Sequence, residues 1–279
     1  TFLKYFRENT NKKMAVVAPT GVAALNVGAQ TIHSFFRLKP AFVDVKALKP
    51  TRSKVLKELE LLIIDEISMV RADIFEGIDH SLKLARKNNK PFGGVQVCVI
   101  GDLFQLPPVV TREEKEFFSQ YYKTPFFFGT NSYVAANFTT IQFNTIHRQN
   151  DSAFIQILNA IRAGTCDFTE LEALNSRLNP KASPAPGTLV LTTTNALAED
   201  INATKLAGLA GKPRIYNGTL SGDFGMKGGR LPAPEELILK IGAQVMFVKN
   251  DSAGRWVNGT IGLVKDLNDE VISVSVGDV

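Results

Sequence analysis

Acidic and amide side chains follow two apolar runs of this sequence, and their types and spacing suit phosphate chemistry. The run 61–64 ends in Asp65-Glu66, and Gln105 follows the run 95–100. A carboxylate such as Asp65 is a typical ligand for Mg²⁺, held through water, and Glu66 beside it can polarise an attacking water. Gln105 can hydrogen-bond a terminal phosphate and register its loss. Together these residues indicate a nucleotide-hydrolysing site.

Each signal has a structural alternative when it is taken alone. Asp65-Glu66 can simply be a core strand running into an acidic turn, because short strings of this kind recur by chance. Pro107-Pro108, which stiffen the loop after Gln105 by fixing φ, also suit an ordinary surface turn. Two such strand ends separated by one helix are a far more specific signal for a nucleotide-hydrolysing site than either one alone.

The turn Pro19-Thr20-Gly21 follows an earlier apolar run, 14–18. Thr20 can cap the helix that comes next, and free backbone N–H groups at such a turn suit an anion. In a motor that moves on nucleic acid, that anion is a phosphate of the strand.

The stretch 30–36 follows closely and mixes hydroxyl, imidazole and aromatic side chains. His33 or Phe36 can stack on a base, and Thr31 or Ser34 can reach a phosphate. Adjacent phenylalanines are more often core residues, so one of Phe35 and Phe36 is expected to be buried.

Arg148 lies in the string His147-Arg148-Gln149, at the start of the second half of the chain. An arginine across a cleft from a phosphate can stabilise the charge that develops in phosphoryl transfer. The alternatives are a surface arginine in a salt bridge and, for His147, a packed or capping imidazole.

A phosphate-binding loop of the form Gly-x-x-x-x-Gly-Lys-Ser/Thr is missing from the sequence. The one Gly-Lys pair, Gly211-Lys212, is followed by Pro213. Such a loop cradles phosphates and directly precedes a helix. Because residues 2–9 read as a helix that leads into the strand at 14–18, the loop is expected just upstream of Thr1, in a longer protein.

Composition bounds the class of protein. The chain has 279 residues, of which 44% are hydrophobic and 21% charged, so two domains with buried cores are expected. The net charge of +5 is compatible with a nucleic-acid partner but does not require one. No run approaches the roughly 20 apolar residues of a membrane span, and no signal peptide is visible. Two distant cysteines indicate neither a zinc site nor a disulfide framework and favour a reducing compartment.

Apolar runs alternate with helical patterns up to about residue 140, which predicts an α/β fold with a parallel sheet. The helix expected at 72–87 carries its apolar residues at helical spacing. A second unit is predicted from about 141, with helices at 153–163, 168–178 and 196–206 and a strand at 188–191. After about residue 213, successive strands at 238–248, 259–264 and 271–276 predict a small antiparallel barrel.

Six ordered strings closely resemble those of Pif-one DNA helicases, superfamily-one motors related to the RecD helicases. The strings are Ala18–Ala24, Gln30–Phe36, Ile64–Met69, Lys90–Gly94, Gly101–Val109 and His147–Gln149. Further matches in the second half extend the resemblance over essentially the whole chain.

The resemblance implies tandem RecA-like P-loop NTPase domains, at 1–140 (truncated at its N-terminus) and 141–279 (incomplete). It also implies a small SH3-like all-β insertion from about residue 213. ATP lies between the two domains and single-stranded DNA runs across their top. The implied activity is ATP-dependent unwinding of DNA with 5′ to 3′ movement.

The resemblance also implies a role for each residue of the site. Asp65 matches the Mg²⁺ ligand, Glu66 the catalytic carboxylate, Gln105 the γ-phosphate sensor and Arg148 the arginine in the cleft. The residues that match the strand-binding stretch are Pro19, Thr20, Gly21, Thr31, His33, Ser34 and Phe36.

The implied cofactors are ATP and Mg²⁺, and the implied partners are single-stranded DNA and DNA junctions or other structured DNA. The motor is expected to be monomeric and intracellular: cytoplasmic in a bacterium, nuclear or mitochondrial in a eukaryote. Because the phosphate loop and the last motor motifs are missing, the chain alone is expected to be inactive. Two alternatives are an ATP-independent nucleic-acid-binding remnant and the helicase part of a rolling-circle transposon protein.

Overall fold

The computed structural model describes most of the chain. The described residues are 2–26, 28–39, 41–147, 150–179, 185, 187–219, 233–249, 251, 253–256 and 259–277. Residues 137–188 form one compact unit, and residues 1–136 and 189–279 are grouped in the other. The domain boundary near residue 140 stays a prediction.

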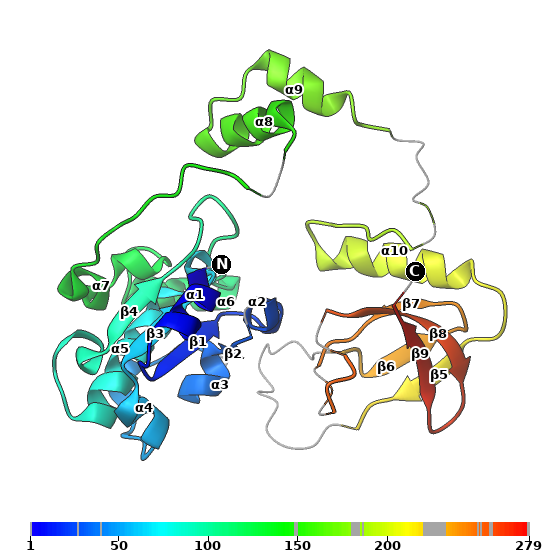
Figure 1. Cartoon of the computed structure of the whole chain (residues 1–279). Helices are drawn as coiled ribbons and strands as arrows, with labels where there is room; N and C mark the ends of the chain where they lie inside the picture. Colours follow the sequence, from blue (N-terminus) through cyan, green and yellow to red (C-terminus); the bar gives the residue numbers. More distant parts are fainter. Residues whose placement is uncertain are drawn as a thin grey trace. The chain divides into compact units, whose positions relative to one another are not determined.

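A parallel four-stranded sheet organises the described residues of the N-terminal segment (Figure 1). Its strand order is β2-β1-β3-β4, and every neighbouring pair is parallel. The strands are β1 (Met14–Ala18), β2 (Gln30–Thr31), β3 (Leu61–Ile64) and β4 (Gln96–Val99). All four residues of β3 are buried, as expected for a strand covered on both faces. The predicted α/β fold with a parallel sheet is confirmed for this segment.

Seven helices and four short 3₁₀ turns are described in the same segment as the sheet. Leu3 and Phe6 of the N-terminal helix pack against a core cluster of Val16, Leu61 and Ile63. The helices of this segment are α1 (Phe2–Asn9), α2 (Gly21–Asn26), α3 (Ile32–Phe36), α4 (Lys54–Glu58), α5 (Ala72–Arg86), α6 (Arg112–Ser119) and α7 (Asn131–Ala136). Short 3₁₀ turns are η1 (Val45–Ala47), η2 (Ile67–Met69), η3 (Pro91–Gly94) and η4 (Phe127–Gly129).

Helix α5 confirms the helical spacing of the sequence, because Ile74, Ile78 and Leu82 are all buried. The turn η3 is tied back to this helix. Asp79 Oδ1 accepts the backbone N–H of Phe92 (2.6 Å), and Arg86 Nε donates to the carbonyl of Gly93 (2.8 Å). The string at 90–94 therefore has a structural role, which is to fix the chain between α5 and β4.

Gly93 offers a sharp test of this turn, because its φ is +61° and an added Cβ would lie 2.7 Å from the carbonyl oxygen of Leu82. We expect Gly93→Ala to lower the free energy of unfolding by ~1–3 kcal/mol more than Gly28→Ala does. Gly28 has nearly the same φ (+62°), but its added Cβ meets only the Arg7 side chain at 3.7 Å. Chemical denaturation of both variants measures the difference, and equal losses would mean that backbone strain alone matters.

The unit at 137–188 contains two helices, α8 (Ser152–Ala163) and α9 (Phe168–Asn175). Asp151 and Asp167 cap their N-termini, and Gly164, with φ +67°, ends α8. Both helices confirm the sequence prediction, although α9 ends three residues earlier than expected.

The C-terminal segment begins with the predicted helix, α10 (Asn195–Ala207), and continues with two small antiparallel sheets. One sheet pairs β5 (Arg214–Asn217) with β6 (Glu236–Leu239), and the other has the order β7-β8-β9. The strands of the second sheet are β7 (Gln244–Met246), β8 (Ile261–Leu267) and β9 (Ile272–Val276). The predicted antiparallel β element is confirmed, but the run 238–248 is two strands, because Gly242 turns the chain at φ +85°.

The strand predicted at 188–191 is wrong for this structure. These residues are not in a strand, and Leu189 and Leu191 are 62% and 94% exposed. A parallel strand needs a neighbour to pair with, and no described residue pairs with this run. In the part of the chain that the structure describes, no helix is both long and apolar enough to cross a bilayer.

Candidate active site

The strand register brings the predicted phosphate-binding residues to one edge of the parallel sheet. Val17 of β1, Ile64 of β3 and Val99 of β4 lie side by side. The residues that follow these strands therefore meet at the carboxyl edge, where open α/β sheets bind ligands. The backbone N–H of Asp65 donates to the carbonyl of Val17 (2.9 Å), which fixes Asp65 directly at this edge.

Glu66 has a left-handed backbone, with φ 50° and ψ 45°. This conformation is unfavourable for a residue with a Cβ and costs on the order of 1–3 kcal/mol. Asp65 Oδ1 accepts the N–H of Glu66 (3.1 Å), and the Glu66 side chain makes no capping bond to η2. A strained acidic residue at the end of a buried strand is typical of a functional site.

Gly101 packs against the turn that follows Glu66. A Cβ on Gly101 would lie 2.9 Å from both the backbone N and Cγ2 of Ile67. The N–H of Ile67 also donates to the carbonyl of Ile100 (3.0 Å). Glycine is required here because only its backbone can approach η2 so closely.

Gln105 follows β4 on an exposed turn that Asp102 organises. Asp102 Oδ1 accepts the N–H of Phe104 (3.1 Å), and Asp102 Oδ2 accepts Gln105 Nε2 (3.1 Å). The turn therefore fixes the Gln105 amide relative to Asp102, in the loop that follows β4. This role of Asp102 was not predicted, although aspartate often forms such turns by accepting the N–H two residues later.

Arg148, the predicted arginine of the cleft, lies outside the described residues. Its role stays a prediction, as do the chemical roles of Asp65, Glu66 and Gln105.

The predicted strand-binding residues lie at the end of β2 or just after β1 and β2, at the same edge of the sheet. Ala18 of β1 pairs with Thr31 of β2, so Pro19, Thr20 and Gly21 come next to the start of α3. Thr20 Oγ1 accepts the N–H of Ala23 (3.2 Å), which confirms that Thr20 caps α2.

Thr31 caps the next helix, α3, because its Oγ1 accepts the N–H of Ser34 (3.3 Å). The Ser34 side chain is exposed. His33 is half-buried, and this burial, together with the positive charge of Arg71, lowers the pKa of its imidazole. At neutral pH His33 is therefore uncharged and suits stacking better than ion pairing with a phosphate.

Phe36 is buried, with 7% of its surface exposed, whereas Phe35 is partly exposed. The two rings meet edge to face, with centroids 5.0 Å apart. A pocket of about 300 Å³ adjoins them and is lined also by Ser34 and Arg37. The expectation that one of the pair is core is confirmed. The DNA-binding role of Phe36 stays a prediction, but Phe35 has the more accessible ring.

These two phenylalanines make a matched pair for experiment. We expect Phe36→Ala to lower the free energy of unfolding by ~3–5 kcal/mol, as is typical for a buried aromatic residue. We expect Phe35→Ala to weaken binding of single-stranded DNA by ~1–3 kcal/mol through the loss of a stacking face. Thermal unfolding and fluorescence anisotropy with a labelled oligonucleotide separate the two effects. Weaker DNA binding by stably folded Phe36→Ala, with Phe35→Ala unchanged, would reverse this assignment.

Arg71 is at the centre of a group of ion pairs that was not predicted from the sequence. Its guanidinium donates to both carboxylate oxygens of Asp73 (2.9 and 2.6 Å) and to both of Glu114 (3.2 and 3.1 Å). Asp73 is completely buried and also accepts the N–H of Val43 (2.8 Å). Burial opposes ionisation of Glu114, but the Arg71 charge and bonds from Thr111 outweigh it, so the pKa of Glu114 is lowered.

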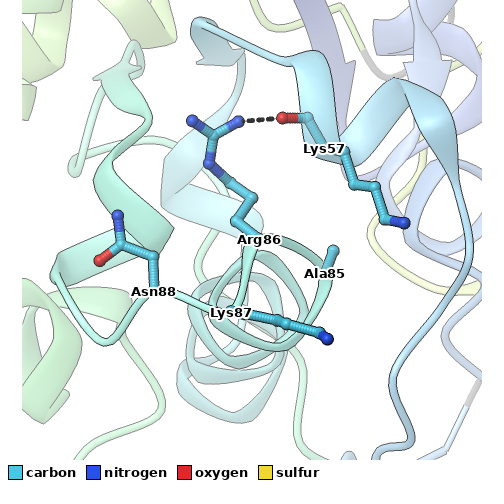
Figure 2. Close-up of a pocket in the computed structure, with 5 residues that line it drawn as sticks. All are labelled: Lys57, Ala85, Arg86, Lys87 and Asn88. Atoms are coloured by element: carbon cyan, nitrogen blue, oxygen red, sulfur yellow. Dashed lines mark hydrogen bonds between the residues drawn. The ribbon is translucent and has the colours of Figure 1, made fainter.

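A pocket of about 330 Å³ lies elsewhere on this segment and is not part of the site (Figure 2). Arg86 points across it and donates to the carbonyl of Lys57 (2.5 Å), as Figure 2 shows, and to that of Leu59 (2.9 Å). These carbonyls precede β3, whereas Asp65 follows it. Arg86 therefore joins the end of α4 to α5. The pocket lies at this structural junction and not at the candidate active site.

The donor set fits a magnesium ion held by few protein ligands. Within the described residues, no three His, Cys, Asp or Glu side chains cluster as a metal site. Mg²⁺ bound with a nucleotide commonly uses one or two carboxylates, together with phosphate oxygens and waters. Asp65, at the sheet edge, has a carboxylate that could serve as one such ligand.

A family model described as PIF1-like helicase matches residues 1–172 of the chain. The chain belongs to the PIF1-like helicase family. Among curated relatives, ATP-dependent DNA helicase Pif1 of Bdellovibrio bacteriovorus is 32% identical, and the match covers 97% of this chain and 62% of the relative. ATP-dependent DNA helicase PIF1 of Saccharomyces cerevisiae is 38% identical, with 95% and 31% covered.

Solved structures of PIF1-like helicases have the same fold. The crystal structure of Bacteroides Pif1 bound to ssDNA matches with a TM-score of 0.85 and 38% identity, over 99% of this chain and 65% of that one. A Bacteroides Pif1 complex with ADP-AlF3 and ssDNA matches with a TM-score of 0.82 and 37% identity, over 99% and 65%. This PIF1-like chain thus spans less than two thirds of the length of these relatives.

Proposed function

We propose that the chain is part of an ATP-dependent DNA helicase that moves 5′ to 3′ along single-stranded DNA. The observation that carries the proposal is the division of one sheet edge between two sets of residues. Those with phosphate chemistry follow β3 and β4, and those suited to a DNA strand follow β1 and β2. Neighbouring strands of one rigid sheet thus connect hydrolysis with strand binding.

A solved relative supports the pairing of nucleotide with DNA in one protein, because it was crystallised with both ADP-AlF3 and ssDNA. In the proposed mechanism Glu66 accepts a proton from the attacking water, and Gln105 hydrogen-bonds the terminal phosphate. Asp65 would hold Mg²⁺, which supplies positive charge that offsets charge on the phosphates. Arg148 would stabilise the transferring phosphoryl group from the second motor domain.

The proposal includes the larger architecture. The chain contributes most of a first RecA-like domain and part of a second, with the antiparallel strands from β5 to β9 as an SH3-like insertion. Pro19, Thr20, Gly21, Thr31, His33 and Ser34 bind the DNA strand, with Phe35 or Phe36 stacking on a base. The proposed partners are single-stranded DNA and structured or forked DNA, and the proposed motor is a monomer.

ATP hydrolysis and DNA unwinding by two forms of the protein test the proposal. We expect a full-length protein that contains this chain to hydrolyse ATP faster with single-stranded DNA, and to unwind only substrates with a 5′ tail. The 279-residue chain alone should hydrolyse no ATP, because it has no phosphate-binding loop. DNA binding by the full-length protein without any ATP hydrolysis would instead identify an ATP-independent nucleic-acid binder.

A further inference from the structure

The Gln105 loop, residues 101–111, is attached at both ends to the segment 67–71, which directly follows Glu66. At its start, Gly101 packs under Ile67, and the carbonyl before the loop accepts the N–H of Ile67. At its end, Thr111 caps α6, and Glu114 in the first turn of α6 binds Arg71.

Most side chains in the body of the loop are exposed, among them Leu106 and Val109 at 66% and 71%, whereas Pro108 is buried. Packing in the body of the loop therefore depends on Pro108, and the two attachments hold the residues on either side of it. Pro107 and Pro108 lie between Gln105 and the second attachment and stiffen the connection.

Arg71 is well suited to hold the second attachment. Its side chain is 12% exposed, and its guanidinium is oriented by both oxygens of the fully buried Asp73. Nη1 lies within hydrogen-bond distance of both oxygens of Glu114 (3.2 and 3.1 Å), so this charged pair shares one donor nitrogen between two acceptor oxygens. The guanidinium also lies over the ring of Phe118 on α6, 5.7 Å from its centroid.

We propose that the Arg71–Glu114 pair is a clamp that positions Gln105 relative to Glu66. The inference rests on the proposed function and adds two positioning residues to it. Neither side chain needs to touch nucleotide, because both act through the placement of the loop. When the clamp is broken, the loop keeps its start but loses the charged attachment at its end, so Gln105 is held less tightly relative to the catalytic carboxylate.

Glu114→Gln weakens the clamp with little damage to the fold, because it removes the charge and one acceptor oxygen. Glutamine at this position retains the capping box with Thr111, because Gln can serve there as Glu does. It removes the charge and replaces one of the two acceptor oxygens by a donor that opposes Arg71. Glu113→Gln is the matched control, since Glu113 is the exposed neighbour in the same helical turn.

We expect Glu114→Gln in the full-length protein to lower the DNA-stimulated kcat by ~10- to 100-fold, as misplacement of a reacting group does. KM for ATP, the Kd for single-stranded DNA and the thermal midpoint should stay close to those of the unaltered protein. Glu113→Gln should leave all four unchanged. Equal kcat values for the two variants, or a loss that follows a lower thermal midpoint, would overturn the clamp.

Hydrogen–deuterium exchange supplies a readout that does not depend on activity. Residues 101–111 should exchange faster in Glu114→Gln than in Glu113→Gln, and equal exchange would overturn the clamp. Faster exchange in a protein that shows no DNA-stimulated hydrolysis even when unaltered would support the clamp as a structural link and reject the proposed function. Arg71→Met combined with Glu114→Gln should reduce kcat no further than the more severe single variant, and additive losses would count against the pair.

Discussion

Glu66→Gln in the full-length protein should abolish DNA-stimulated ATP turnover while ATP still binds. An amide has nearly the shape of the carboxylate but cannot accept a proton from the attacking water, so we expect kcat to fall by ~10²- to 10⁴-fold. We expect the left-handed turn at Glu66 to be kept, because the change is confined to the end of the side chain. Steady-state hydrolysis with single-stranded DNA and equilibrium binding of a fluorescent nucleotide measure the two properties separately.

Glu60→Gln is a matched control, because Glu60 lies just before β3 and Glu66 lies just after it. Glu60 Oε2 accepts the N–H of Lys13 (2.8 Å), an acceptor role that glutamine retains. We expect full activity from this control. If Glu66→Gln turned over ATP as fast as Glu60→Gln does, another group would have to be the base.

Asp73→Ala should cause a large loss of stability. Asp73 is fully buried and accepts three hydrogen bonds, two from Arg71 and one from the backbone of Val43. Removing the carboxylate leaves the largely buried Arg71 without its closest partner, and breaking such a pair typically costs ~3–5 kcal/mol. Urea unfolding of the variant, followed by circular dichroism, measures the change.

Asp44→Ala is the comparison for this effect, because Asp44 is exposed and accepts one bond, from the N–H of Lys46 (2.9 Å). Loss of such a cap should cost only ~1 kcal/mol. Similar unfolding midpoints for the two variants would mean that the buried charge pair contributes little to the fold.

Local patterns in the sequence were sufficient to predict the framework of the site. Strands β1, β3 and β4 are apolar runs, and α5 has regular helical spacing, so both follow from short-range signals. Because the strands are parallel, the residues after each one must reach the same edge. That rule alone predicted that Asp65, Glu66 and the Gln105 loop would be neighbours.

Features that depend on distant contacts were not predicted. Arg71 and Glu114 are 43 positions apart, and nothing in the sequence indicates that they pair. The capping signal Thr111-x-x-Glu114 was present and would have indicated the start of α6. Which of Phe35 and Phe36 is buried depends on which ring faces the core. The strand expected at 188–191 does not form because a strand requires a partner to pair with.

The position of β4 has a practical consequence for the chain in isolation. Among the strands that the structure describes, β4 pairs only with β3 and ends the sheet, and its residues Val97, Cys98 and Val99 are only partly buried. A strand with an unpaired backbone edge is a template for another strand, including one from a second molecule. The isolated chain is therefore expected to aggregate as its concentration rises, and a charged substitution at Val97 should improve its solubility.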